Sequence, residues 1–184
     1  MIHVVPYSDL WPREFERVAA VLRAALVGTP GARVEHVGST SVPGLAAKPI
    51  IDIDVVVAAH QMLPAIHALE RLGYAHDGDL GLDGREAFDA PDDDPPRHVY
   101  VCLEGTLHVR NHLAVRDILR RRPDLRDSYA AVKLALTDDP DMDIDTYTAG
   151  KSAVLQEVLA ESDLTAPERR LIRQLNDPMG EYAR

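Results

Sequence analysis

Residues Val34 to Val57, VEHVGSTSVPGLAAKPIIDIDVVV, constrain the fold of this chain more than any other stretch. Two apolar runs flank a segment of small and turn-forming residues that begins at Gly38, which is typical of two strands joined by a turn-rich connection. The second apolar run is interrupted only by Asp52 and Asp54. The pattern therefore predicts a strand that carries two carboxylates.

The spacing of the two acids puts them on one face of that strand. Residues i and i+2 project from the same side of a strand, so Asp52 and Asp54 point one way and Ile53 points the other. Two neighbouring carboxylates in an apolar strand are unfavourable unless a cation or protons lie between them. Mg²⁺ takes oxygen ligands, commonly one or two carboxylates together with phosphates. We therefore expect Asp52 and Asp54 to bind Mg²⁺.

The turn before the acidic strand has the composition of a phosphate-binding loop. Gly38 allows the backbone to approach a ligand closely, and Ser39 and Thr40 supply hydroxyl and N–H donors. The alternative for the acids alone is an edge strand whose outer face is wet, because Asp-x-Asp is common there. Gly38-Ser39 followed after twelve residues by Asp52-Ile53-Asp54-Val55 is the more specific combination.

That combination resembles the signature of the DNA polymerase β-like nucleotidyltransferase superfamily. EHVGSTSVPGLAAKPIIDIDVVV is more closely similar to the GrpB family within it, and the similarity continues in order through HVYV, RNHLAVRDILRRRPDLRDSYAAVKLAL and YTAGKSAVLQEVLA. It covers roughly residues 2–161. The resemblance implies an α+β fold, a nucleotidyltransferase-like mixed β-sheet packed with helices, and metal-dependent nucleotidyl transfer as the chemistry.

The periodicity of the remaining sequence agrees with an α+β chain whose C-terminal half is helical. A helix is predicted after Ser8 or Asp9, another over about residues 60–72, and strands over about 74–76, 85–89 and 97–101. From Val109 the pattern predicts three helices, the second beginning at Pro123 and the third containing Tyr147 to Leu159. We expect one GrpB-like nucleotidyltransferase-fold domain over 1–162, followed by a C-terminal helix and tail over 163–184.

Composition limits the partners and the compartment. The formal net charge of −10 argues against a broad nucleic-acid-binding surface. The N-terminus has no basic segment followed by a long apolar core, and no run reaches membrane-spanning length, so we expect a cytoplasmic protein without a membrane partner. Cys102 lies in an apolar run, which favours a buried thiol over a nucleophile.

The strand near residue 98 is expected to face the same site. His98 and Tyr100 share its polar face, whereas the superfamily usually places a third carboxylate on a strand after the paired acids. Glu104 just beyond the strand and Glu35 before the turn are alternative sources of that acid, and spacing does not decide between them. Asp52, Asp54 and His98 are thus the predicted catalytic residues.

Basic side chains and a pair of histidines are further candidate ligands. We predict that Lys48, Arg116, Lys133 and Lys151 bind phosphates together with Gly38, Ser39 and Thr40, because phosphate chemistry needs cations beyond the metal; exposed helix charges are the alternative. His108 and His112 are four residues apart, but no HExxH motif or third ligand accompanies them, so a zinc site is not expected.

These features predict a Mg²⁺-dependent nucleotidyltransferase that transfers a nucleoside monophosphate from a nucleoside triphosphate to an acceptor. The acceptor is a small molecule or protein that the sequence does not identify. One alternative is a non-catalytic nucleotide- or small-molecule-binding protein on the same fold. Another is a phosphohydrolase in which His98 acts as acid or base.

Overall fold

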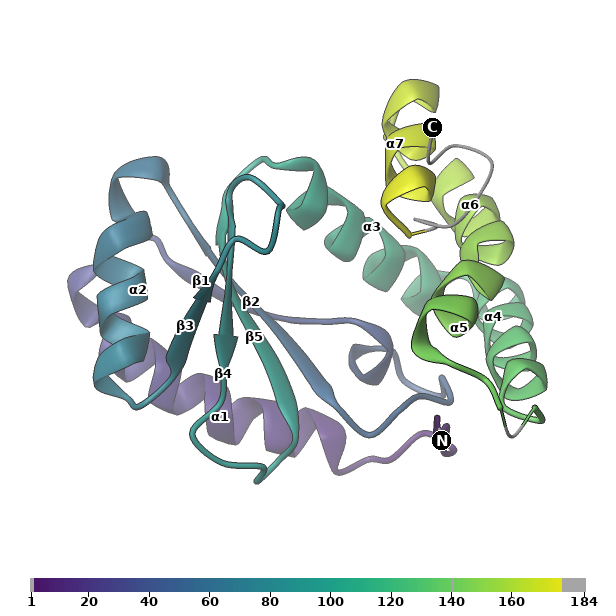
Figure 1. Cartoon of the computed structure of the whole chain (residues 1–184), viewed down its shortest axis with the longest axis horizontal. Coiled ribbons are helices and arrows are strands. Elements are labelled where there is room, and N and C mark those ends of the chain that lie inside the picture. Colours follow the sequence, from purple (N-terminus) through teal and green to yellow (C-terminus); the bar gives the residue numbers. More distant parts are fainter. Residues whose placement is uncertain (1, 140, 177–184) are drawn as a thin grey trace.

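The computed structural model describes residues 2–139 and 141–176, and its centre is a five-stranded mixed sheet (Figure 1). The strands lie in the order β1-β2-β5-β4-β3. Their bounds are β1 Arg33–Val37, β2 Ile51–Val57, β3 Ala75–Gly78, β4 Arg85–Asp89 and β5 Arg97–Leu103. The helices are α1 Trp11–Ala25, α2 Met62–Arg71, α3 Leu107–Arg121, α4 Pro123–Leu136, α5 Ile144–Gly150, α6 Ser152–Ala160 and α7 Ala166–Asn176. The predicted α+β class with a helical C-terminal half is confirmed.

Strand β2, which carries the two acids, lies between β1 and β5. It pairs with β1 in antiparallel and with β5 in parallel orientation. The register places Asp52 opposite His98 of β5, and Asp54 between Tyr100 of β5 and Glu35 of β1. The sheet therefore brings the acids and His98 together from positions far apart in the sequence.

The two faces of the sheet are covered by different helices. Helices α1 and α2 pack on the face that carries Ile53 and Val99, and Leu22 and Leu69 are fully buried there. Helix α3 crosses the opposite face, where Val109 is buried with Cys102 and Val56. Alternation along β2 thus directs its isoleucines to the α1/α2 core and its aspartates toward α3 and the helical half.

A second hydrophobic core holds the C-terminal helices to the loop that follows β1. Its buried members are Val42, Leu45, Ile118, Leu119, Tyr129, Val154 and Val158. Helices α3, α4 and α6 meet in this core, and Figure 1 shows α3 running from the sheet toward α4 and α6 at the right of the view. The loop containing Val42 and Leu45 therefore connects the sheet to the helical half.

The prediction of one helix over Tyr147 to Leu159 was wrong, because the structure divides this segment into α5 and α6 at Lys151. Gly150 ends α5, and a Cβ added there would lie 2.7 Å from Leu136 Cδ2. Glycine weakens a helix interior and permits close packing of α5 against α4. Lys151 consequently lies at the junction of the two helices.

Two features complete the fold. The segment predicted as a C-terminal helix and tail contains α7, whose Ile172 is buried with Leu159 and Leu164; residues 177–184 lie outside the described part of the chain. Cys102 is buried, as predicted. Across the described residues, every helix is too short or too polar to cross a membrane.

Candidate functional site

A cavity of about 270 Å³ lies between the acidic strand and the C-terminal helices. Of the ten predicted site residues, eight line it and two, Asp54 and Arg116, do not. The lining residues are Gly38, Ser39, Thr40, Lys48, Ile50, Asp52, His98, Tyr129, Lys133, Tyr147 and Lys151. The fold therefore brings the glycine turn, one predicted acid, the histidine and three predicted cations to one place.

The acidic wall of the cavity is a carboxylate–imidazole pair. The His98 Nδ1 atom lies 2.9 Å from Asp52 Oδ1, and this hydrogen bond raises the pKa of His98. About 30% of the Asp52 side chain and 50% of the His98 side chain are exposed, so both remain accessible to a ligand. With Nδ1 engaged by Asp52, the Nε2 atom of His98 is left to exchange a proton.

The turn after β1 brings its backbone against Asp52. Gly38 has φ 68° and ψ −173°, a conformation that is essentially restricted to glycine. A Cβ at this position would lie 2.1 Å from Asp52 Oδ2 and 2.9 Å from Asp52 Cβ. The absence of a side chain at Gly38 therefore allows the Asp52 carboxylate to pack directly against the turn.

The hydroxyl of Thr40 has a structural role. It donates a hydrogen bond to the Ile50 carbonyl at 3.1 Å and lies 3.1 Å from His36 Nε2. The Ser41 hydroxyl donates to the Gly38 carbonyl at 2.6 Å and closes the turn. Thr40 lines the cavity, but its hydroxyl is already hydrogen-bonded within the β1–β2 connection. The half-exposed hydroxyl of the turn is that of Ser39.

The basic wall contains every lysine of the chain: Lys48, Lys133 and Lys151 are the three lysines of the sequence, and all line this cavity. Lys133 is 2% exposed and donates a hydrogen bond to the Ala46 carbonyl. Burial, with a contribution from the neighbouring Lys151, lowers the pKa of Lys133 to about 7. Burial, with a contribution from Lys48, lowers the pKa of Lys151 to about 8. An anion in the cavity would relieve both effects.

Tyr129 and Tyr147, which were not among the predicted site residues, form part of the same wall. The Lys133 ammonium lies 4.5 Å from the centre of the Tyr129 ring, and the Lys151 ammonium lies 4.2 Å from that of Tyr147. Both pairs have the spacing i, i+4, which places two side chains on one helix face. The repeated Tyr-x-x-x-Lys pattern was a signal that could have identified these residues.

Arg116 lies outside the cavity and is engaged elsewhere. Its Nη1 atom lies 2.8 Å from Glu35 Oε2, and its Nε atom lies 2.7 Å from Asp117 Oδ1. Glu35, one of the two acids considered as a third carboxylate, is held by this ion pair. The other, Glu104, has a carboxylate oxygen 3.8 Å from Arg33 Nη1. Neither glutamate lines the cavity.

Asp54 is fully buried and faces helix α3. Its Oδ2 atom lies 2.9 Å from His112 Nδ1, while its Oδ1 atom has no hydrogen-bond partner among the described residues. His108, one turn earlier, has its ring centre 4.0 Å from that of His112. Burial, with a contribution from His112, lowers the pKa of His108 to about 3, which keeps the ring neutral. The expectation that His108 and His112 lack a third ligand partner was wrong, because Asp54 comes from a strand 54 residues earlier than His108.

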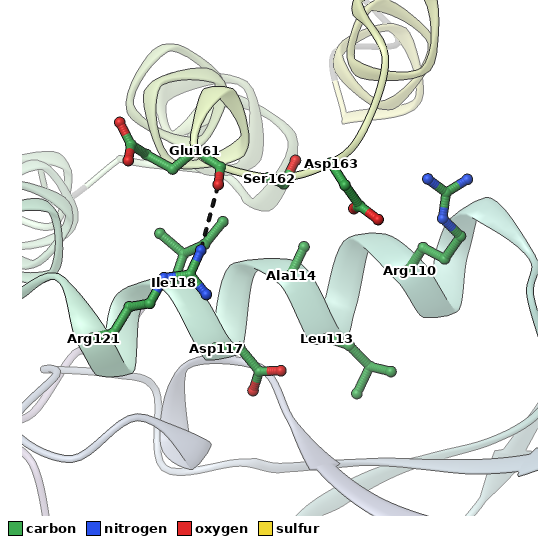
Figure 2. Close-up of a pocket in the computed structure, with 9 residues that line it drawn as sticks. All are labelled: Arg110, Leu113, Ala114, Asp117, Ile118, Arg121, Glu161, Ser162 and Asp163. Atoms are coloured by element: carbon green, nitrogen blue, oxygen red, sulfur yellow. Dashed lines mark hydrogen bonds between the residues drawn. The ribbon is translucent and has the colours of Figure 1, made fainter.

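A separate hollow of about 310 Å³ lies between α3 and the segment joining α6 to α7 (Figure 2). Arg121 Nη2 donates a hydrogen bond to the Glu161 carbonyl at 3.4 Å on one side of it. Arg110, on the other side, has its Nη1 atom 2.6 Å from Glu168 Oε1. The hollow contains none of the predicted site residues, and two of its cations already have partners, so it is not the candidate site.

The fold is nucleotidyltransferase-like. The chain is similar to the Cid1 poly(U) polymerase in its MgGTP-bound structure, with a TM-score of 0.60 and 16% identity over 90% of this chain and 54% of that chain. At this identity the similarity concerns the fold alone.

The chain belongs to the GrpB protein family, whose sequence profile matches residues 1–161. It is similar to the GrpB protein of Enterococcus faecalis, whose crystal structure gives a TM-score of 0.73 and 34% identity over 86% of this chain and 98% of that one. It is also 37% identical to a UPF0157 protein of Halalkalibacterium halodurans, over 89% of this chain and 84% of that protein. The family resemblance predicted from the motifs is confirmed.

Proposed function

We propose that the protein is a Mg²⁺-dependent nucleotidyltransferase that moves a nucleoside monophosphate from a nucleoside triphosphate to an acceptor hydroxyl. The observation that carries this proposal is the gathering of all three lysines opposite the Asp52–His98 pair in one cavity. Buried lysines with lowered pKa values are costly in the free protein, and a polyphosphate would offset that cost. The nucleotidyltransferase fold supports the same ligand class.

The residues fit a magnesium ion at the acidic wall. Asp52 lines the cavity with about 30% of its side chain exposed, and Asp54 projects from the same face of β2. Asp52 would hold the ion, whereas Asp54 is fully buried and does not line the cavity. When bound, Mg²⁺ would polarise the phosphoryl oxygens and orient the triphosphate.

The residues of the chain then have separate roles. The turn at Gly38 and Ser39 would contact phosphate oxygens, while Lys48, Lys133 and Lys151 would neutralise the charge of the departing pyrophosphate. The acceptor oxygen forms a bond to the α-phosphorus as the bond from the α-phosphorus to the bridging oxygen of pyrophosphate breaks. His98 Nε2 would accept the proton of the acceptor hydroxyl, with Asp52 holding Nδ1.

One observation favours a second candidate, a nucleotide-binding protein without transferase activity. The positions of β5 opposite Asp52 and Asp54 are His98 and Tyr100, not a third carboxylate. Both candidates predict the same Mg²⁺-nucleotide complex and differ only in turnover. If turnover occurs with water as the acceptor, the products are the nucleoside monophosphate and pyrophosphate, and His98→Ala should reduce their formation.

Both candidates predict that the protein binds a Mg²⁺-nucleotide complex. Thermal unfolding with each common nucleoside triphosphate, with and without Mg²⁺, tests this binding. A ligand present at a hundred times its Kd adds about 2.7 kcal/mol to the free energy of unfolding. For a chain of this size that corresponds to a rise of roughly 5–10 °C in Tm. The rise should require Mg²⁺ and disappear in Asp52→Asn.

The matched control is Asp93→Asn, which removes an exposed carboxylate from the loop before β5 and should keep the full rise. No rise with any nucleotide in the wild type would contradict the proposal. Incubation of the Mg²⁺-nucleotide complex with candidate hydroxyl acceptors, followed by mass spectrometry, then separates transferase from binding protein.

A further inference from the structure

Unsatisfied buried polar atoms concentrate at one place in the structure. Among the described residues, five buried side-chain nitrogen or oxygen atoms have no hydrogen-bond partner. Four of them belong to Asp54, Arg85, His108 and Asn111, at the junction of β2, β4 and α3. A buried polar atom without a partner costs free energy, so a cluster of four is a place where a polar or charged ligand would be stabilised.

The donor atoms in this cluster converge. Asp54, His108 and His112 each offer one ligand atom, and these three atoms lie within 4.8 Å of one another. Ligands bound at about 2.1 Å lie at most about 4.2 Å apart across one ion, so closure around an ion needs side-chain shifts below about 1 Å. The scaffold is rigid, because Asp54 is in a central strand and both histidines are on one face of α3.

The chemistry of the donors selects the class of ion. Mg²⁺ prefers an all-oxygen shell, whereas two imidazoles and one carboxylate suit Zn²⁺, Fe²⁺, Co²⁺ or Ni²⁺. Both His108 and His112, together with Arg85, line a cavity of about 340 Å³ on the α7 side of the sheet. Three protein ligands, two of which line the cavity, leave coordination positions open to water or an added ligand.

We propose that Asp54, His108 and His112 form a binding site for a divalent transition-metal ion, distinct from the magnesium–nucleotide cavity. The unpartnered Oδ1 of Asp54 and Nε2 of His108 supply two of the ligands, and His112 supplies the third. The guanidinium of Arg85, 4.8 Å from the centre of the Tyr100 ring, contributes positive charge to the same cavity. The open side of the ion is therefore suited to an anionic ligand.

The test is titration of the metal-free full-length protein with Co²⁺, followed by visible absorption, and with Zn²⁺, followed by calorimetry. We expect one ion per chain and the absorption bands of Co²⁺ with nitrogen ligands. Loss of an outer-shell partner typically reduces metal affinity 10–100-fold, so His108→Ala and His112→Ala, which remove direct ligands, should each reduce affinity by more than this. The matched control is His67→Ala, which removes an exposed imidazole of α2 and should leave the affinity unchanged.

Two further variants separate this site from the proposed function. Asp52→Asn should lose the Mg²⁺-nucleotide response and keep Co²⁺ binding, whereas His108→Phe should keep the nucleotide response and lose Co²⁺. His108→Phe also replaces the imidazole by an apolar ring in a buried position, so the cooperativity of its thermal unfolding will show whether the fold is retained. Absence of Co²⁺ and Zn²⁺ binding in the wild type, or unchanged binding in folded His108 and His112 variants, would overturn the proposal.

Discussion

Gly38 and Asp52 are packed so closely that a methyl group on Gly38 would overlap the Asp52 carboxylate, with Cβ 2.1 Å from Oδ2. The two residues lie at the end of β1 and within β2, which are antiparallel neighbours. Their contact sets the position of the acidic wall relative to the turn. It also leaves no space for a side chain at position 38.

We predict that Gly38→Ala lowers the free energy of unfolding by at least about 2 kcal/mol. The conformation at φ 68° and ψ −173° alone costs a non-glycine residue about 1–3 kcal/mol, and the overlap with Asp52 adds to it. Tm should fall by roughly 4–8 °C, as measured by calorimetry. Gly28→Ala is the control, because a Cβ there meets nothing within 4 Å; equal Tm changes in both variants would contradict the argument.

Binding of a nucleoside triphosphate should weaken as the pH rises from 7 to 9. Lys133 and Lys151, with pKa values of about 7 and about 8, lose their charge over this range, and neutral amines attract phosphates less. Each pKa unit corresponds to about 1.4 kcal/mol, so Kd should increase at least about tenfold between pH 7 and 9. Calorimetric titration of Mg²⁺-nucleotide measures this, and a flat profile would show that the two amines do not contact the ligand. In Lys133→Arg, which stays charged, the slope should be shallower.

Lys133→Met should stabilise the free protein near pH 7. The pKa of Lys133 in the folded state, about 7, is below its ordinary value of 10.5, so the unfolded chain binds more protons between these values. Wild-type stability should therefore increase as the pH rises from 7 toward 9.5, by up to a few kcal/mol. Chemical denaturation at several pH values should show a smaller slope for the methionine variant. Parallel slopes for the two proteins would exclude Lys133 as the titrating group.

Nucleotide should protect all side-chain amines from chemical modification. Because the three lysines all line one cavity, a bound Mg²⁺-nucleotide should lower acylation of each. Intact-mass spectrometry after treatment with an amine-reactive ester reports the number of labels directly. A nucleoside without phosphates is the control and should give less protection. Undiminished labelling of Lys48 would restrict the contact to Lys133 and Lys151.

The sequence predicted the sheet side of the site well because its signals are local. Alternation placed Asp52 and Asp54 on one face of β2, and the polar face of β5 placed His98 toward them. Both follow from the alternation of side chains along a strand, which does not depend on how the strand packs in the fold. The close backbone approach at Gly38 was also predictable, because such an approach requires a residue without a side chain.

The remaining features depend on contacts between distant segments. Asp54 pairs with His112, 58 residues later in the chain, and neither residue has a local pattern that indicates the other. Arg116 was expected at the phosphates, but Glu35, 81 residues earlier, holds it elsewhere. Such pairs are decided by how α3 crosses the sheet, and single-sequence periodicity gives the buried face of a helix without its crossing direction.

The cavity has one wall on the sheet and one wall on the C-terminal helices. Asp52 and His98 belong to the sheet that packs on α1 and α2, whereas Lys133 is on α4, whose Tyr129 belongs to the core formed by the C-terminal helices. A polyanion bound between these walls would hold the C-terminal helices in a fixed position relative to the sheet. Its effect should therefore extend to α7, which contacts α6 and lines no part of the cavity, as slower exchange of its amide hydrogens with solvent.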